Sequence, residues 1–391
     1  MNEKLNLDHL KIHPLRFAPE NVNFIVETGG PCAAKTSILA PAMQKLQDMG
    51  ICVATMPELA TDFAMNGFAP GKLMSGDAFQ HAILLGTIER EYRAWNMMRS
   101  VEVPKQVPKL IITDRGRLDG AAYMDQDEFY AMAASYGYSP GDLGEAFYKA
   151  VIHLRSVAFD APTLYTTENN PARKETIPQA VERDAATLKA WHSHPHLRVI
   201  SNLVDKTRII TIEEKASRFV AEVAHALGIP VPLEIERKFL LTTTRGLAFP
   251  QDLHIETIDI QQYYIRTPAG VDERIRMRTW RGHSVYYRTI KSEVSLGVRS
   301  EVERIISIQE FVSLLRYVKP NTHPVTKQRL VFIWENQYIE VDMFLGRNEG
   351  LMTFEIELTN VSNEFSIPHF LKPCVDVTND PRYSNAQLAL K

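Results

Sequence analysis

Up to about residue 228, short runs of apolar, β-branched residues alternate with longer stretches of helical periodicity. Parallel strands need long crossover connections, usually helices, so this alternation predicts an α/β fold in which helices cover a parallel sheet. The pattern also predicts a closing amphipathic helix over 212–227. The predicted strands are 22–27, 51–56, 109–113, 163–166 and 197–200.

A stiff break follows this closing helix. Gly228 is a residue type that ends helices, and neither Pro230 nor Pro232 can continue one. We therefore predict two domains, 1–228 and 233–391, joined by a short hinge at 229–232.

Beyond the hinge, the apolar residues recur at every second position, which is the period of a β-strand. One helix is predicted among these strands, over 308–317. Eight strands with a single helix favour an α+β domain built on a closed antiparallel barrel. The predicted strands are 234–240, 259–266, 273–278, 284–291, 301–308, 326–334, 337–344 and 352–358.

Charged residues share one face of several of these strands. In the first strand Glu234, Glu236 and Lys238 are two positions apart, so their side chains point the same way. An antiparallel sheet with one solvated face explains any single strand of this kind. If the barrel closes with the charges inward, however, the confined like charges need ligands that neutralise them. The other charges in phase are Arg274, Arg276, Arg278, Lys291, Glu301, Glu303, Lys327, Arg329, Asp342, Glu355 and Glu357.

A polyphosphate would satisfy the arginines and lysines, and Mg²⁺ or Mn²⁺ would neutralise the carboxylates. The Glu-x-Glu-x-Lys sequence at 234–238 and the charged strands that follow it in order resemble the CYTH superfamily of triphosphate tunnel metalloenzymes. The segments 376–378 and 383–385 are similar to the ending of that family. The resemblance covers 233–391, the whole of the predicted second domain.

This resemblance implies a role for each charged group. The phosphates would be bound by Arg274, Arg276, Arg278, Lys291, Lys327 and Arg329. Metal would be bound by Glu234, Glu236, Glu355 and Glu357, and the remaining candidate metal ligands are Glu301, Glu303 and Asp342. Lys238 would contact phosphate or orient a carboxylate, and together with Glu234 and Glu236 it forms the expected catalytic set. Catalysis would come from positioning and charge neutralisation of the transferring phosphoryl group.

The first predicted strand leads into a glycine-rich loop. Residues 29–36 read Gly-Gly-Pro-Cys-Ala-Ala-Lys-Thr, close to the phosphate-binding motif G-x-x-x-x-G-K-[ST]. In such a loop, backbone amides and the dipole of the next helix bind phosphate, so Gly29, Gly30, Lys35 and Thr36 are predicted to bind a nucleotide. Ala34 replaces the second glycine of the motif, and its Cβ weakens binding if that position needs a positive φ.

Other polar residues are expected near this loop. Asp114 and Arg115 follow a buried strand, at a sheet edge where a Mg²⁺ ligand would lie. Glu58, just past the second strand, is either a base or substrate contact or a glutamate favoured by a helix N-terminus. Arg173 and Arg183 lie in a polar stretch that is either a lid that clamps phosphates or a solvated helix face.

This half resembles a nucleotide-kinase-like group of AAA-type P-loop domains, through the loop at 29–36, the Asp114-Arg115 pair and the arginines of the possible lid. The resemblance implies that Lys35 binds the β- and γ-phosphates, that Thr36 binds Mg²⁺, and that Asp114 lies in the metal's water shell. Relatives that pair the same two domains are linked with GTP binding and lipid phosphates, so the resemblance leaves ATP and GTP both open as the expected nucleotide.

Composition and charge bear on the partners and the cellular location of the protein. The chain has 391 residues and a formal net charge of −3, which favours neither nucleic acid nor an anionic membrane as a partner. Its three scattered cysteines predict a reducing compartment, and no apolar run is long enough to span a bilayer, so we expect a cytoplasmic protein. The expected partners are nucleotides and polyphosphates, and the pattern leaves the oligomeric state open.

Three functional hypotheses follow. The first is a metal-dependent phosphohydrolase whose barrel cleaves a triphosphate while the P-loop half binds ATP or GTP. The second is a nucleotide-controlled protein whose barrel binds a phosphorylated ligand or lipid head group without turnover. The third is a small-molecule or nucleoside kinase activity of the P-loop half.

Overall fold

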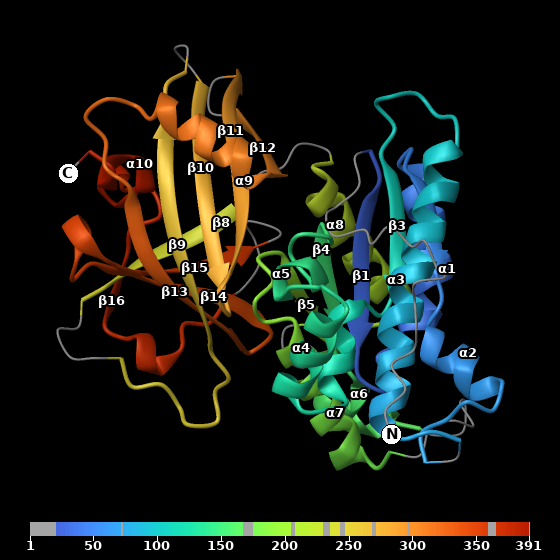
Figure 1. Ribbon diagram of the computed structural model, residues 1–391. Helices are drawn as coiled ribbons and strands as arrows, with labels where there is room; N and C mark the ends of the chain where they lie inside the picture. Colours follow the sequence, from blue (N-terminus) through green and yellow to red (C-terminus); the bar gives the residue numbers. More distant parts are fainter. Residues whose placement is uncertain are drawn as a thin grey trace.

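The computed structural model describes residues 21–71, 73–166, 175–204, 208–229, 235–242, 247–267, 271–295, 298–358 and 365–390. The side chains of 235, 271, 291–295, 298–302 and 358 are outside this description. Two halves of different architecture lie side by side, an α/β half before residue 229 and a β-rich half after residue 235 (Figure 1). No helix among the described residues is both long and apolar enough to cross a membrane.

The N-terminal half contains a five-stranded sheet in the order β2-β3-β1-β4-β5. Every pair of neighbours in it is parallel, as the alternating pattern predicts. Its middle strand, β1, leads directly into the glycine-rich loop. The strands are β1 (Asn23–Gly29), β2 (Cys52–Met56), β3 (Lys109–Asp114), β4 (Ala150–Leu154) and β5 (Leu197–Ile200).

One of the five predicted strands is wrong. Residues 163–166 form no strand: Pro162 begins the 3-10 helix η3 (Pro162–Leu164), and Leu164 is exposed. The fourth strand is instead β4, whose five residues are all buried. A short, continuous apolar run does not distinguish a buried strand from a buried helix segment, so the sequence pattern missed it.

Helices cover both faces of this sheet and produce two apolar cores. Ile25, Ile112 and Ile152 point to the face covered by α1 (Lys35–Asp48) and α8 (Ile212–Leu227). The opposite core includes residues of α3 (Gly76–Ser100), α4 (Gln126–Ser135) and α7 (Ile177–Ala190). The smaller elements are α2 (Leu59–Met65), η2 (Arg117–Ala122), α5 (Pro140–Leu143), α6 (Val157–Asp160), β6 (Leu203–Val204) and β7 (Arg208–Ile209).

The boundaries of α8 agree with the predicted helix at 212–227. The Thr211 side chain accepts a hydrogen bond from the Glu214 amide, and the Glu214 carboxylate accepts one from the Thr211 amide at 2.8 Å. This reciprocal cap satisfies two amides that the first helical turn leaves unpaired. Gly228 ends the helix with a φ of 74°, a left-handed conformation that glycine adopts without steric cost.

The C-terminal half is one antiparallel sheet in the order β12-β11-β10-β9-β13-β14-β15-β8-β16. Nine strands occur among its described residues, so the predicted count of eight is wrong. The missed strand, β16, has only three residues, too few for an alternating pattern. Within the described residues no ladder joins the edge strands β12 and β16, so the sheet does not close as a hydrogen-bonded barrel. The strands are β8 (Ile235–Leu241), β9 (Glu256–Ile265), β10 (Val271–Trp280), β11 (His283–Ser295), β12 (Val298–Ile306), β13 (Val325–Trp334), β14 (Gln337–Phe344), β15 (Met352–Leu358) and β16 (Cys374–Asp376).

The outer face of this sheet is apolar. On β10 and β11, Ile275 and Tyr286 pack against Phe311 of α9 (Ile308–Leu314), which continues as η4 (Leu315–Tyr317). Phe239 of β8 and Phe354 of β15 belong to a second apolar cluster on this outer face. Their rings are stacked, with the ring centroids 4.8 Å apart. The remaining short elements are η5 (Gly346–Asn348), η6 (His369–Leu371), η7 (Pro381–Tyr383) and α10 (Asn385–Leu388).

The two halves share an apolar interface. Ile258, Ile260 and Val331 of the C-terminal sheet belong to the same buried cluster as Phe24 and other core residues of the N-terminal half. The rings of Trp280 and Tyr130 meet edge to face at 5.6 Å, which joins β10 to α4. The face of the sheet that carries the predicted charges therefore also carries apolar residues at one end. The N-terminal half packs against those apolar residues.

Candidate functional site

The predicted inward-facing charges of the C-terminal half meet at one cavity of about 610 Å³. Side chains alternate between the two faces of a strand, so charged residues two positions apart point to the same face of the sheet. Ser384, which follows η7, and Asn385, the first residue of α10, also line this cavity. The predicted residues that line it are Glu236, Lys238, Arg274, Arg276, Arg278, Glu303, Lys327, Arg329, Glu355 and Glu357.

Asp342 lies behind two of the cations. Arg329 donates to both of its carboxylate oxygens, at 2.7 and 2.8 Å, and Lys327 forms a second ion pair with it. Burial opposes ionisation, but these two cations hold the pKa of Asp342 well below its ordinary value. Asp342 is 1% exposed and is not among the cavity residues, so here it orients cations instead of facing a ligand.

Carboxylates and one lysine of β8 and β15 form a further part of the cavity wall. Glu236 of β8 and Glu357 of β15 are cross-strand partners, and so are Lys238 and Glu355. Lys238 Nζ lies 2.7 Å from a Glu355 oxygen and 3.6 Å from a Glu236 oxygen. Lys238 therefore orients two candidate metal ligands, and their negative charge raises its pKa despite the opposing effect of burial.

Two of the described carboxylates, Glu236 and Glu357, have the chemistry of metal ligands. Carboxylate oxygens are the donors that Mg²⁺ and Mn²⁺ prefer, and Glu236 and Glu357 are adjacent on neighbouring strands. No group of three His, Cys, Asp or Glu side chains suited to a metal occurs among the described residues. Glu234, the partner expected for these two, and the side chains of Glu301 and Lys291 lie outside the described part of the chain.

The arginines of β10 differ in their surroundings. Arg276 is paired with Glu303 at 2.5 Å, and its Nε has no hydrogen-bond partner among the described residues. Arg278 is 1% exposed and anchored to the N-terminal half, through Glu145 at 3.3 Å and the carbonyl of Ser193 at 3.3 Å. One of the three phosphate ligands predicted on β10 is therefore also an interface residue.

The glycine-rich loop between β1 and α1 has the backbone of a phosphate-binding turn. Ala34 adopts a left-handed conformation with a φ of 65°, so the position does need the positive φ that glycine favours. Lys35 Nζ lies 3.7 Å from Asp114 at the end of β3, and Thr36 is exposed at the start of α1. The buried Lys215 supports the loop from α8 by donating to the carbonyl of Ala33 at 2.9 Å.

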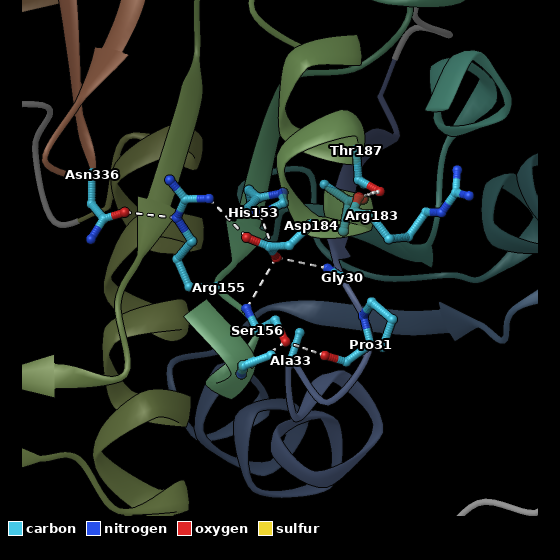
Figure 2. Close-up of polar contacts among 12 residues, drawn as sticks. Gly30, Pro31, Ala33, His153, Arg155, Ser156, Arg183, Asp184, Thr187 and Asn336 are labelled. Atoms are coloured by element: carbon cyan, nitrogen blue, oxygen red, sulfur yellow. Dashed lines mark hydrogen bonds and ion pairs between the residues drawn. The ribbon is translucent and has the colours of Figure 1, made fainter. Parts of the chain in front are cut away.

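A buried carboxylate, Asp184, lies against the same loop (Figure 2). It accepts hydrogen bonds from the Gly30 and Ser156 amides, both at 3.0 Å, and contacts His153 at 3.1 Å. Arg155 pairs with it at 2.8 Å and donates through Nε to Asn336, in the turn between β13 and β14, at 2.7 Å. The loop is thereby linked to the C-terminal half by direct contacts.

A second pocket, of about 200 Å³, opens beside the loop at the carboxyl ends of β2 and β3. Glu58 and Asp119 both pair with Arg115, at 3.0 and 3.2 Å. Burial alone would raise the pKa of Glu58, but the charges of Arg115 and Lys35 hold it at about 2. Apolar side chains form most of the remaining wall, from Met56, Pro57, Leu59, Phe79 and Ile83.

The predicted lid is only partly described. The Arg183 guanidinium lies 4.3 Å from the ring centroid of Tyr123 and donates to the carbonyl of Ala122. In this arrangement it packs on η2 and points away from Gly30 (Figure 2). Arg173 lies outside the described residues.

Several site residues were missed at the sequence level. Glu340 lines the cavity of about 610 Å³, hereafter the tunnel cavity, and is two positions before Asp342, so the strand period would have found it. Lys149, His196 and His225 line the same cavity from the N-terminal half, and no sequence signal places them there. Asp184 likewise carries no motif, because only folding brings α7 against the glycine-rich loop.

Comparisons with known proteins find a different family in each half of the chain. Residues 24–207 match the AAA domain family, and residues 232–364 match the CYTH domain family. The inorganic triphosphatase of Acetivibrio thermocellus is 34% identical over 160 residues, which cover 40% of this chain and 92% of the relative. The inorganic triphosphatase of Nitrosomonas europaea is 32% identical over 167 residues, covering 40% of this chain and 97% of the relative.

A solved structure of an inorganic triphosphatase is 29% identical, covers 41% of this chain and 95% of its own, and has a TM-score of 0.30. The sequence relatives are matched over nearly their whole length by the half that carries the charged cavity. The chain therefore belongs to the CYTH family through its C-terminal half, and carries an AAA domain before it.

Proposed function

We propose that the C-terminal cavity hydrolyses inorganic triphosphate or a related phosphoanhydride with a divalent metal ion, while the N-terminal half binds ATP or GTP. The observation that carries this proposal is the meeting of a cationic wall and a carboxylate wall in one cavity of about 610 Å³. That volume lies within the usual range of small-molecule sites. The relatives named as inorganic triphosphatases support this substrate class.

The cationic wall would bind the phosphates. Arg276 and Arg329 present planar guanidinium groups, which suit phosphate oxygens, and Lys327 adds a point charge. Asp342 and Glu303 hold these cations in place before substrate arrives, which lowers the ordering that binding requires. The expected contribution is positioning and neutralisation of the phosphoryl oxygens.

The carboxylate wall would hold the metal, through Glu236 with Glu234 and with Glu355 or Glu357. A bound Mg²⁺ or Mn²⁺ would supply charge neutralisation and an activated water. Lys238, held by Glu236 and Glu355, keeps these carboxylates oriented toward the cavity. Its own positive charge lowers the repulsion between them.

The test is phosphate release from inorganic triphosphate, ATP and GTP, with Mg²⁺, with Mn²⁺ and after chelation. We compare the wild type with Glu236→Gln, which keeps the size of the side chain but loses a charged ligand, and with Lys35→Ala in the glycine-rich loop. Release from triphosphate should stop in Glu236→Gln and after chelation, and persist in Lys35→Ala. Tight binding of triphosphate by the wild type without any release would instead make the cavity a binding site without turnover.

A second activity, phosphoryl transfer in the N-terminal half, is favoured by the 200 Å³ pocket beside the glycine-rich loop. Its apolar wall suits the body of a small molecule, and the ionised Glu58 would accept a hydrogen bond from its hydroxyl group. Asp114, which lines this pocket, is also the partner of Lys35, so an acceptor would lie near the γ-phosphate. Transfer of labelled γ-phosphate from ATP or GTP to nucleosides tests this reading, and Glu58→Gln should abolish it.

A further inference from the structure

The wall of the tunnel cavity nearest the N-terminal half is not made by the CYTH sheet alone. Lys149, which precedes β4, and His196, which precedes β5, line the cavity together with His225 of α8. These segments are far apart in the sequence and are brought together by the parallel sheet, where β4 and β5 are neighbours. In Figure 1, β4 and β5 are drawn on the side of the N-terminal half that faces the other half.

Ion pairs hold this wall against the sheet. Arg198 of β5 pairs with Glu357, and His225 Nε2 lies 3.7 Å from the same carboxylate. A second ion pair joins Arg278 of β10 to Glu145, four residues before Lys149. Because both anchors are more than half buried, the wall is held in one position relative to the phosphate-binding strands.

Lys149 differs from most other cations of the cavity. Lys238, Lys327, Arg276, Arg278 and Arg329 each pair with a carboxylate. Lys149 is half-buried and forms no salt bridge within the described part of the chain. An ammonium group that lines the cavity without a carboxylate partner can pair with an anion that enters the cavity.

We propose that the N-terminal half completes the substrate site, with Lys149 as a ligand of a substrate phosphate. The site would therefore be composite, built from both halves of the chain. The inference rests on the proposed binding of a triphosphate in this cavity, and adds a residue that the CYTH strands do not contain. A charge-assisted hydrogen bond from Lys149 would add to the contacts made by the β10 and β13 cations.

The test uses the full chain with Lys149→Met, which keeps length but not charge, and Lys149→Arg, which keeps charge. The control is Lys189→Met, an exposed lysine of α7 that lines neither cavity. Equilibrium binding of inorganic triphosphate and steady-state release are measured for each. Lys149→Met should raise the dissociation constant and KM roughly 10- to 100-fold, Lys149→Arg should restore most of the affinity, and the control should match the wild type.

Failure of the proposed function and failure of the composite site give different results. A wild type that neither binds nor cleaves triphosphate refutes the proposed function itself. A wild type that does, together with a folded Lys149→Met variant of unchanged affinity and KM, refutes the composite site alone. Circular dichroism and the thermal midpoint establish that each variant is folded.

Discussion

Replacing Asp184 with Asn tests the buried contact centre beside the glycine-rich loop (Figure 2). Asn keeps an oxygen that can accept from the Gly30 and Ser156 amides, but it removes the negative charge that faces Arg155 at 2.8 Å. Asp184 is fully buried, so the guanidinium would be left with an uncompensated charge. Breaking a buried pair in this way costs roughly 3–5 kcal/mol of the free energy of unfolding.

Denaturant unfolding of the wild type, Asp184→Asn, Arg155→Met and the double variant measures this cost. Removing both partners leaves no orphan charge, so the double variant should lose clearly less than the sum of the single losses. Asn336→Gly, which removes the other partner of Arg155 and suits the φ of 64° at this position, serves as a neutral hydrogen-bond control and should cost about 1 kcal/mol. A loss under about 1 kcal/mol in Asp184→Asn, or strictly additive losses, would refute the reasoning.

The same pair predicts a pH dependence. Burial opposes ionisation, but the contacts with His153 and Arg155 hold the pKa of Asp184 well below its unfolded value of about 3.9. The folded pKa is thus the lower one, so the stabilisation is fully present above pH of about 4 and is lost as the pH falls further. The difference in unfolding free energy between wild type and Asp184→Asn should therefore be constant near neutrality and shrink in acid.

Three further predictions concern the loop, the cavity and the outer core. Ala34→Gly should raise the free energy of unfolding by about 1 kcal/mol and tighten nucleotide binding, because the residue sits at a φ of 65°; unfolding and nucleotide titrations measure both. Arg276→Gln should raise KM for triphosphate roughly tenfold or more, whereas the exposed Arg316→Gln should leave it unchanged. Phe354→Ala should cost about 3–5 kcal/mol in denaturant unfolding, because its fully buried ring stacks on Phe239 outside the cavity.

Helices and strands with a clear periodic pattern were predictable from the sequence. The helix at 212–227 was predictable because its cap residues and its apolar stripe agree with one another. The strands at 337–344 and 352–358 were predictable because alternation along a half-buried strand repeats every two residues. Strands β4 and β16 were missed because a short buried run and a three-residue pairing carry no period.

The charged face of the C-terminal half was also readable, since residues two apart on a strand share a face wherever that strand lies. The sequence by itself thus determined which side chains point together and which phosphate chemistry they suit. Tertiary structure alone decided which of them reach the cavity: it moved Asp342 behind two cations and anchored Arg278 to Glu145. It also brought Lys149 and Arg198 to a wall of the other half. The Asp342 contacts join neighbouring strands, and the pairing of those strands is set by the folded sheet. The contacts of Arg278 with Glu145 and of Arg198 with Glu357 join residues more than a hundred positions apart. Over such separations neither helical nor strand periodicity carries information, and only the packing of two complete cores sets the distance.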